Sequence, residues 1–338
     1  MTRPRLAITL GDPTGVGPEI AAAILGEAAS RAAVAVFGHW PALEAALRRG
    51  GVRVPVQIEG ALPEPLPAGR VTVVHTGTGE GERPTGEGIA AAQLRALDLA
   101  IDAALAGRCD AIVTAPISKV SVAGVSPGFT GHTEHLAARC GLRPEDVTMV
   151  FASRELAVGL LATHVPLRDV PATVTRERCE RTLRHVAQVA VALRPGRAPR
   201  IAVAALNPHA GEGGLLGREE ADVLGPFCEA ARARGLDVAG PIPADAVFRD
   251  ALAGAYDGVV AMYHDQAMIP LKLAGFGRTA NVTAGLPFVR TSLDHGVARD
   301  RAGTGRADPS GMRLAVDVAI ELWRARAGGG APQGFRAI

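Results

Sequence analysis

Short apolar runs alternate with alanine-rich stretches of helical periodicity along the chain. Runs of this length and uniform hydrophobicity are typical of strands buried on both faces of a sheet. The strand–helix alternation therefore predicts an α/β fold with a largely parallel sheet and helices on both faces. The predicted strands are residues 6–10, 33–37, 71–75, 111–114, 147–152, 158–163, 201–206 and 258–263. The predicted helices include residues 19–29, 87–106, 176–193 and 218–234.

Two lobes are expected, because 338 residues are many for a single hydrophobic core. We assign residues 1–130 and 281–338 to the first lobe and residues 131–280 to the second. The Pro- and Gly-rich segment 54–70 is predicted to be a surface excursion, and the tail 328–338 a frayed end. Ligands of such sheets bind at the loops that follow the carboxyl ends of the strands, so candidate chemistry is sought there.

Three of the nine histidines follow predicted strands, namely His164, His209 and His264. Three neutral imidazoles at one edge of a parallel sheet would form a divalent metal site with positions open for substrate or water. Each could instead be an ordinary hydrogen-bonding residue at a loop end, since no local motif links them. Asp265, beside His264, could orient that ring, coordinate the metal or cap the next segment.

Lysine is nearly absent: 34 of the 36 basic residues are arginine, and only Lys119 and Lys272 remain. A lysine amine can lose its proton when it is desolvated or crowded by positive charge, which arginine does not do. The retained lysines therefore indicate an active site, although chance retention would also explain them.

His132 and Thr133 stand where a helix is predicted to begin, with Thr133 as the N-cap. The free N–H groups and the positive dipole end of a helix N-terminus suit a phosphate or carboxylate. An ordinary capping box would give the same local pattern.

The turn Gly11–Glu19 joins the first strand to the first helix, but it lacks the G-x-G-x-x-G fingerprint and the Walker Gly-Lys-Ser/Thr. A tight turn with proline at the helix start accounts for it. A second loop, residues 294–309, is similar to the adenosine-binding loop of the isopropylmalate and isocitrate dehydrogenases. The similarity implies NAD(P) contacts at His295, Gly296, Ala302, Gly303, Gly305 and Asp308.

Longer blocks resemble the 4-hydroxythreonine-4-phosphate dehydrogenase family of pyridoxal phosphate biosynthesis, which includes sugar-acid 4-phosphate dehydrogenases. They occur in order along most of the chain: GDPTGVGPEI, TAPISK, FTGHTEHLA, LNPHAGEGGLLGREE, PIPAD, YHDQ and LKLAGFGRTANVTAGLPFVRTSLDHG. The resemblance implies a two-lobed αβα sandwich of the isopropylmalate/isocitrate dehydrogenase type, with the active site in the interlobe cleft. It also implies a homodimer whose active site is shared between subunits.

Residue roles follow from the same resemblance. His164, His209 and His264 match the ligands of a divalent ion (zinc, magnesium, cobalt or manganese), with one of them supplied by the partner subunit. The substrate-binding positions are His132, Thr133, Lys272, Asn281 and Arg290.

The implied reaction is a metal-dependent, NAD- or NADP-linked oxidation of 4-phosphohydroxy-L-threonine. The resulting β-keto acid decarboxylates to 3-amino-2-oxopropyl phosphate. Lys272 is the candidate base or, equally, a counter-ion of phosphate or carboxylate, and Asp265 is the second candidate catalytic residue. Asp300 and Asp308 favour NAD over NADP.

Three departures from the family pattern leave the substrate open: Ala115, Ala267 and Val297. They allow a D-threonate or D-erythronate 4-phosphate dehydrogenase with the same oxidative decarboxylation. A metal-dependent hydrolase or lyase could use similar histidines but would have no use for the loop 294–309. A non-catalytic metal- or phosphate-binding paralogue would tolerate loss of these residues, all of which are present.

The composition argues against nucleic-acid-binding, disulfide-rich and membrane-spanning proteins. A net charge of +2 and 4% aromatic residues do not favour nucleic-acid binding. Four dispersed cysteines are typical of reduced thiols, and no apolar run reaches membrane-spanning length. We therefore expect a soluble, cytoplasmic enzyme with no membrane partner.

Overall fold

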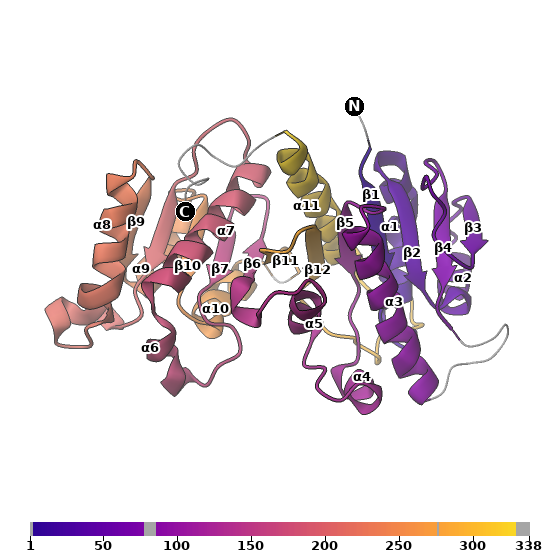
Figure 1. Cartoon of the computed structure of the whole chain (residues 1–338), viewed down its shortest axis with the longest axis horizontal. Coiled ribbons are helices and arrows are strands. Elements are labelled where there is room, and N and C mark those ends of the chain that lie inside the picture. Colours follow the sequence, from indigo (N-terminus) through magenta and orange to yellow (C-terminus); the bar gives the residue numbers. More distant parts are fainter. Residues whose placement is uncertain (1–2, 78–85, 276, 329–338) are drawn as a thin grey trace. The chain divides into compact units, whose positions relative to one another are not determined.

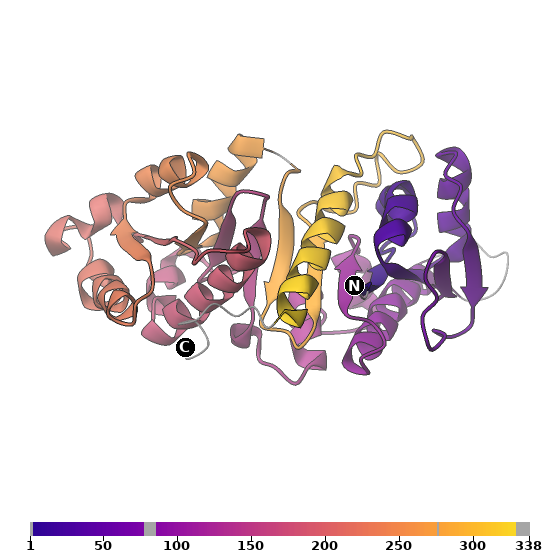
Figure 2. The same ribbon diagram turned by 90° about the horizontal axis from the view of Figure 1, so that it is seen from above.

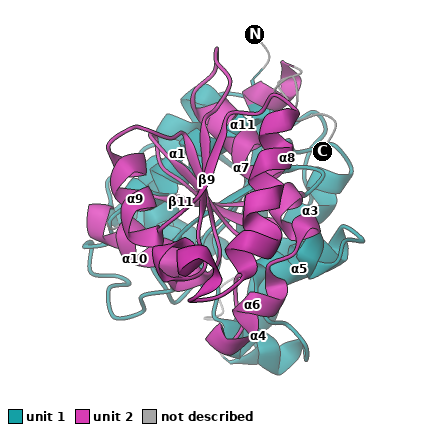
Figure 3. Cartoon of the chain, turned by 90° about the vertical axis from the view of Figure 1, so that its left-hand side faces the viewer, with its two compact units in different colours: residues 1–147, 286–323 teal, residues 148–285, 324–338 magenta. Residues whose placement is uncertain are grey.

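The structure, a computed structural model, describes residues 3–77, 86–275 and 277–328. These residues form two compact units (Figures 1 and 3). Unit 1 comprises residues 1–147 and 286–323, and unit 2 comprises residues 148–285 and 324–338.

Unit 1 holds six parallel strands in the order β3-β4-β2-β1-β5-β12. Their interior positions are almost uniformly buried, as expected for strands covered on both faces. The strands are β1 (Arg5–Thr9), β2 (Ala33–Gly38), β3 (Val56–Glu59), β4 (Val71–His75), β5 (Ala111–Thr114) and β12 (Val289–Leu293).

Helices cover both faces of this sheet. Helices α1 and α11 lie on one side, where Arg313 pairs with Glu27, and α3 lies on the other (Figure 2). The small buried side chains of α3 let this helix approach the strands closely. The helices of unit 1 are α1 (Gly17–Arg31), α2 (Trp40–Arg49), α3 (Glu87–Leu105), α4 (Lys119–Val125) and α5 (His132–Arg139), with the turn η1 (Pro144–Asp146). Helix α11 (Ser310–Ala327) begins in unit 1, and its residues from Arg324 onwards are assigned to unit 2.

Unit 2 has the strand order β11-β6-β7-β10-β8-β9. Here β6 runs antiparallel to both β7 and β11, while β7, β10, β8 and β9 are mutually parallel. The sheet is therefore mixed, although the parallel part is as predicted. The strands are β6 (Thr148–Ala152), β7 (Ala157–Leu160), β8 (Ile201–Ala204), β9 (Val238–Ile242), β10 (Gly258–Ala261) and β11 (Ala280–Ala284).

Helices α7 and α8 pack on one face of this sheet and α9 and α10 on the other (Figure 3). The core beneath α9 and α10 is made by Phe248, Met268 and Leu271 against Val158 and Val259. The helices are α6 (Val170–Thr173), α7 (Arg176–Leu193), α8 (Gly225–Ala233), α9 (Ala244–Leu252) and α10 (His264–Gly275), with turns η2 (Leu167–Asp169) and η3 (Pro208–Gly214) and a π-helix η4 (Glu220–Leu224).

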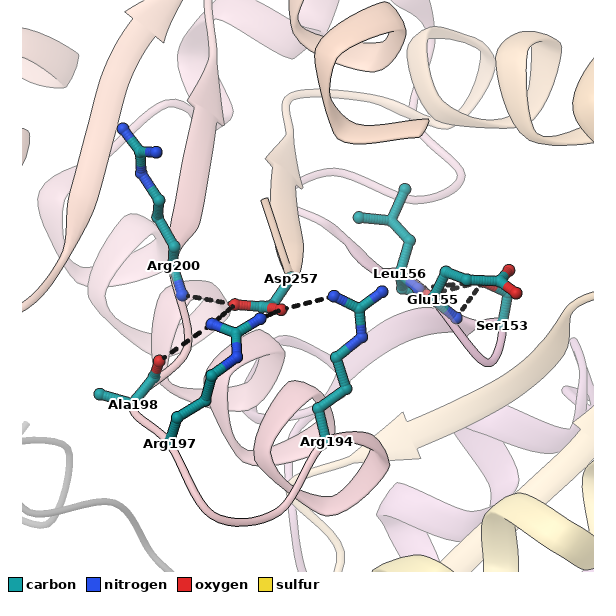
Figure 4. Close-up of polar contacts among 8 residues, drawn as sticks. All are labelled: Ser153, Glu155, Leu156, Arg194, Arg197, Ala198, Arg200 and Asp257. Atoms are coloured by element: carbon teal, nitrogen blue, oxygen red, sulfur yellow. Dashed lines mark hydrogen bonds and ion pairs between the residues drawn. The ribbon is translucent and has the colours of Figure 1, made fainter. Parts of the chain in front are cut away.

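A buried carboxylate ties together the loops before β8 and β10. Asp257 accepts hydrogen bonds from Arg194 Nη1 (2.8 Å), Arg197 Nη1 (2.8 Å) and the backbone N–H of Arg200 (2.8 Å), as Figure 4 shows. Burial alone would raise the pKa of Asp257, but these donors hold it below its usual range. The network lies at the amino ends of β8 and β10, away from the ends that precede the candidate histidines.

Several expectations need correction. The segment 54–70 contains strand β3 and the buried Leu66, so it is part of the sheet and core. The predicted helix 218–234 is instead a π-helix followed by α8. The change occurs because Pro226 lacks the N–H that would continue the hydrogen bonding of the π-helix. Residues 329–338 of the predicted frayed tail lie outside the described residues.

The boundaries of the units also differ from those predicted at 130/131 and 280/281. Helix α5 belongs to unit 1 because Leu136 and Ala137 pack with Ile112 and Phe129 in its core. Strand β11 belongs to unit 2 because it pairs along its length with β6.

Candidate functional site

Arg290 is a buried cation within the sheet of unit 1. It lies on β12, its residue is 2% exposed, and its Nη2 donates to Thr114 Oγ1 at the end of β5 over 2.7 Å. Burial lowers the pKa of Arg290 to about 10, against the opposing effect of Glu134. A guanidinium does not lose its proton at neutral pH. The site therefore carries a desolvated positive charge that an anion would stabilise.

The start of α5 faces the same charge. Burial, and then the charges of Arg290, His135 and Lys119, lower the pKa of His132 well below its usual range. Its Nε2 is buried and has no hydrogen-bond partner among the described residues. A neutral imidazole with a buried nitrogen of this kind is suited to a ligand that brings its own donor or acceptor.

Gly131 lets two further side chains reach this point. A Cβ at Gly131 would lie 2.8 Å from Glu134 Oε2 and 3.4 Å from Lys119 Nζ. Lys119, whose role the sequence left open, thus places its ammonium beside the start of α5. Gly131 itself is the N-cap, so the prediction that Thr133 caps the helix is wrong; Thr133 is its second residue.

A charged pair anchors α5 to α3. Asp98 accepts from His135 Nε2 over 2.7 Å and also pairs with Arg139. Because α5 is only two turns long, these contacts fix the direction in which its first residues point. Thr114 and Lys119 escaped prediction as contact residues, although both lie in the TAPISK block at the end of β5.

Unit 2 brings together two of the three predicted metal ligands. The ring centroids of His164 and His264 are 6.0 Å apart, beyond the carboxyl ends of the parallel strands β7 and β10. His264 Nδ1 lies 2.7 Å from Asp265 Oδ1. A carboxylate at Nδ1 fixes the tautomer and leaves Nε2 to face a ligand. Asp265 thus orients His264.

His209 lies apart, on the left-handed turn η3. Its side chain is 77% exposed, and its Nδ1 lies 3.8 Å from Glu212 Oε2. The backbone has positive φ at six consecutive residues, His209 to Gly214, with φ values of 53°, 53°, 81°, 44°, 67° and 101°. Among the described residues, no three His, Cys, Asp or Glu side chains gather closely enough to hold a metal ion.

A buried carboxylate restrains η3. Glu220, 5% exposed, accepts from the backbone N–H groups of Leu206 and Asn207 (2.8 Å each) and from Asn207 Nδ2 (2.9 Å). These donors hold the pKa of Glu220 below its usual range, although burial alone would raise it. A Cβ at Gly211 would lie 2.9 Å from Glu220 Oε2, so the carboxylate also packs against the middle of the turn.

The other predicted residues of unit 2 lie on α10 and β11. Lys272 is exposed on α10, whose first residue is His264. Asn281 lies on β11 opposite Phe151 of β6, and its Oδ1 is buried without a hydrogen-bond partner among the described residues.

The candidate cofactor loop belongs to unit 1. Gly303 and Gly305 have positive φ (79° and 69°), which glycine adopts without strain. His295 Nδ1 lies 3.0 Å from Gly296 O. Asp308 Oδ1 accepts from the backbone N–H of Ser310, the first residue of α11, and this contact lowers the pKa of Asp308. Asp308 therefore has a helix-capping role beside the contact predicted for it.

Comparison with known proteins identifies the family. The model of the pyridoxal phosphate biosynthetic protein PdxA matches residues 31–319. A 4-hydroxythreonine-4-phosphate dehydrogenase of Geobacter metallireducens is 43% identical over 98% of this chain and 99% of its own length. The chain belongs to this family. It is accordingly a dehydrogenase of the pyridoxal phosphate biosynthesis type.

Solved structures of other dehydrogenases share the fold. The 4-hydroxythreonine-4-phosphate dehydrogenase of Klebsiella pneumoniae is 37% identical, with a TM-score of 0.79 over 95% of this chain and 99% of that one. A terephthalate 1,2-cis-dihydrodiol dehydrogenase of Burkholderia xenovorans is 26% identical, with a TM-score of 0.68 over 95% and 98% of the two chains. The predicted α/β dehydrogenase fold is confirmed.

The three departures from the PdxA pattern are buried or lie at a loop contact. Ala115 is buried next to Gly17, and Ala267 is buried in the core beneath α9 and α10. Val297 contacts Gly15. Ala115 and Val297 thus lie beside the turn Gly11–Glu19, and Ala267 lies in the core beneath α9 and α10.

Proposed function

We propose that this protein catalyses the metal-dependent, NAD-linked oxidation of 4-phosphohydroxy-L-threonine. The observation that carries the proposal is the buried guanidinium of Arg290 beside Thr114 and His132. Its planar fork suits the oxygens of a phosphate group. Thr133 and the first N–H groups of α5 would complete the phosphate site, and Lys119 would add charge at its edge. Asn281, with its buried Oδ1, would accept a hydrogen bond from the substrate.

The metal would be held by His164 and His264, with Asp265 fixing the tautomer of His264. His209 is the third ligand in this proposal, and one of the three comes from a partner subunit. Imidazole donors fit zinc or cobalt best, and magnesium or manganese less well. When bound, the ion would supply Lewis-acid stabilisation of negative charge on the oxygen atoms of the substrate.

The proposed reaction is an oxidation by NAD⁺ followed by a decarboxylation. The hydroxyl proton leaves to a base, and the hydride from the same carbon passes to NAD⁺, giving a β-keto acid. Loss of CO₂ and protonation then give 3-amino-2-oxopropyl phosphate. Lys272 is the base or proton carrier in this scheme; as the alternative, it serves as counter-ion to phosphate or carboxylate.

The cofactor would lie on the loop 294–309, through His295, Gly296, Ala302, Gly303, Gly305 and Asp308. Asp300 and Asp308 favour NAD, since a carboxylate would repel the 2′-phosphate of NADP.

A homodimer with shared active sites is the proposed assembly. Unit 2 exposes large apolar side chains close in sequence to the proposed metal and substrate residues: Leu215 is 84% exposed, Leu273 83% and Ile269 60%. Exposed apolar groups of this size are typical of a surface that a partner covers.

Among the described residues, no helix is long and apolar enough to cross a membrane. Free cysteines fit the proposed cytoplasmic location.

The test is NADH formation from 4-phosphohydroxy-L-threonine, D-threonate 4-phosphate and D-erythronate 4-phosphate in parallel, each with and without a chelator. We expect chelator-sensitive turnover, with the highest kcat/KM for the first substrate. Preference for either sugar-acid phosphate would assign the chain to the alternative substrates of the same chemistry. The absence of NADH from all three, in protein that binds metal, would contradict the proposal.

A further inference from the structure

The glycine-rich turn Gly11–Glu19 has no role in the function proposed above, yet it makes specific contacts. Asp12, directly after the turn's first glycine, is fully buried. Its Oδ1 accepts from the backbone N–H (2.9 Å) and Oγ1 (2.7 Å) of Thr14, and its Oδ2 accepts from Arg299 Nη2 over 2.6 Å. Arg299 Nε also donates to Thr14 Oγ1 over 3.2 Å. A buried carboxylate thus fixes an arginine of the candidate cofactor loop.

A backbone contact lies next to this ion pair. The N–H of Val16 donates to the carbonyl of Val297 over 3.0 Å. A Cβ at Gly15 would lie 2.7 Å from both the carbonyl oxygen and Cγ1 of Val297. The approach of the two backbones therefore requires glycine at position 15.

The third contact comes from the first turn of α1. Glu19 Oε1 accepts from the backbone N–H of Gly303 over 2.7 Å and also lies 3.3 Å from Arg49 Nη2. The Glu19 side chain is 12% exposed. The three contacts therefore reach the loop at Val297, Arg299 and Gly303, within the predicted adenosine-binding segment 294–309.

We propose that Asp12 and Glu19 are positioning residues that hold the loop 297–303 in the conformation that binds the dinucleotide. The turn Gly11–Glu19 is then a brace for a neighbouring loop and does not itself cradle a phosphate. A loop fixed before binding loses less conformational entropy when the ligand arrives, so its affinity is higher. The inference rests on the proposed function in one respect, the assignment of this loop to NAD(H).

A matched pair at position 19 tests the brace. Glu19→Ala removes the acceptor for the Gly303 N–H, whereas Glu19→Gln keeps a carbonyl oxygen in its place. Asp12→Asn removes the charge that pairs with Arg299. The control is Asp110→Asn, which breaks a pair of similar geometry with Arg5 at the other end of the same sheet, where Arg5 Nη2 lies 2.7 Å from Asp110 Oδ1.

Two measurements are made on the full-length protein. Hydrogen exchange followed by mass spectrometry reports the amides of residues 297–304, and NADH fluorescence titration reports dinucleotide affinity. In Glu19→Ala and Asp12→Asn we expect exchange and the Kd for NADH to rise roughly five-fold, the change that loss of one hydrogen bond produces. Binding of inorganic phosphate should not change, and Glu19→Gln and Asp110→Asn should match the wild type in loop exchange.

Unchanged loop exchange in Glu19→Ala and Asp12→Asn would overturn the brace, whatever the affinity. Faster exchange with unchanged NADH affinity would overturn its role in cofactor binding. If the wild-type protein binds neither NADH nor NADPH, the proposed function fails at this loop, and the exchange rates alone then decide whether the brace exists.

Discussion

At the scale of single residues, Arg290 shows how burial determines chemistry. It is the second of the five residues of β12, all of which are buried, and no other residue of this strand carries a charge. A guanidinium there is stable only if its charge is compensated, and Thr114 supplies a neutral oxygen. A phosphate bound beside it would add negative charge to that of Glu134.

Arg290→Lys is expected to raise KM for the phosphorylated substrate roughly 10- to 100-fold, since lysine keeps the charge but cannot form two parallel hydrogen bonds. Steady-state kinetics and competition by inorganic phosphate provide the measurement. The control is Arg143→Lys, at an exposed arginine that pairs with Asp146. An unchanged KM in Arg290→Lys would remove the phosphate assignment.

At the scale of elements, the turn η3 is held in a conformation that most residues avoid. Left-handed backbone costs about 1–2 kcal/mol per non-glycine residue, and three of the six positive-φ residues of η3 are not glycine: His209, Ala210 and Glu212. Strain of this kind persists where the surroundings impose it. Glu220 imposes it here, through hydrogen bonds to residues 206 and 207 and packing against Gly211.

Glu220→Ala should therefore release η3 and weaken metal binding roughly 10- to 100-fold, the usual effect of removing a group that orients a ligand. Titration with Co²⁺, followed by its visible absorption, measures this without turnover. Asp222→Asn is the matched control, because Asp222 lies on the same π-helix but is half exposed and pairs with Arg218. Equal Co²⁺ affinity in Glu220→Ala and the wild type would show that η3 does not depend on Glu220.

At the scale of the whole molecule, pairs of inactive variants test the shared active site. If one metal ligand comes from a partner subunit, a mixture of two ligand variants re-forms one intact site in each mixed dimer. The three mixtures combine alanine variants of His164, His209 and His264 pairwise. The ligand supplied by the partner is the one whose variant complements both others.

Complementing mixtures should reach about a quarter of wild-type activity, because half of randomly assorted dimers are mixed and each contains one intact site. Subunits are exchanged in mild denaturant, and sedimentation confirms that dimers re-form. The absence of activity in all three mixtures would place every ligand in one chain.

Acid stability is a second property of the whole molecule, and His185 on α7 contributes to it. Burial, followed by the charges of Arg184, Arg181 and Arg326, lowers the pKa of His185 to about 3. Its Nδ1 lies 2.8 Å from Thr148 Oγ1. Since the unfolded chain protonates this histidine near pH 6.5 and the folded one does not, the unfolded state binds more protons between pH 6.5 and about 3.

The free energy of unfolding should therefore contain the full contribution of neutral His185 above pH 6.5. This contribution should fall as the pH falls below 6.5, by up to about 1.4 kcal/mol per pH unit. Urea unfolding at several pH values across this window measures the slope for the wild type and for His185→Asn, which keeps a polar group near Thr148 but does not titrate. Equal slopes in the two proteins would show that His185 is not buried in its neutral form.

The sequence by itself determined the local and periodic features. Uniform apolar runs predicted eight of the twelve strands that the structure describes, since a buried parallel strand must be apolar throughout. The four missed strands, β3, β9, β11 and β12, mix polar residues, glycine or proline into short segments, so no run identifies them. The order of strand, loop and helix likewise placed the candidate histidines beyond strand ends.

Only the tertiary structure decided which distant residues meet. Arg290 contacts Thr114 across 176 positions of sequence, and Arg299 contacts Asp12 across 287. The choice of Gly131 as N-cap depends equally on the side chains of Lys119 and Glu134 packed against it. The physical reason is that periodicity and capping are local properties of the chain, whereas burial of a charge and the identity of its partner depend on strand order, which no local pattern encodes.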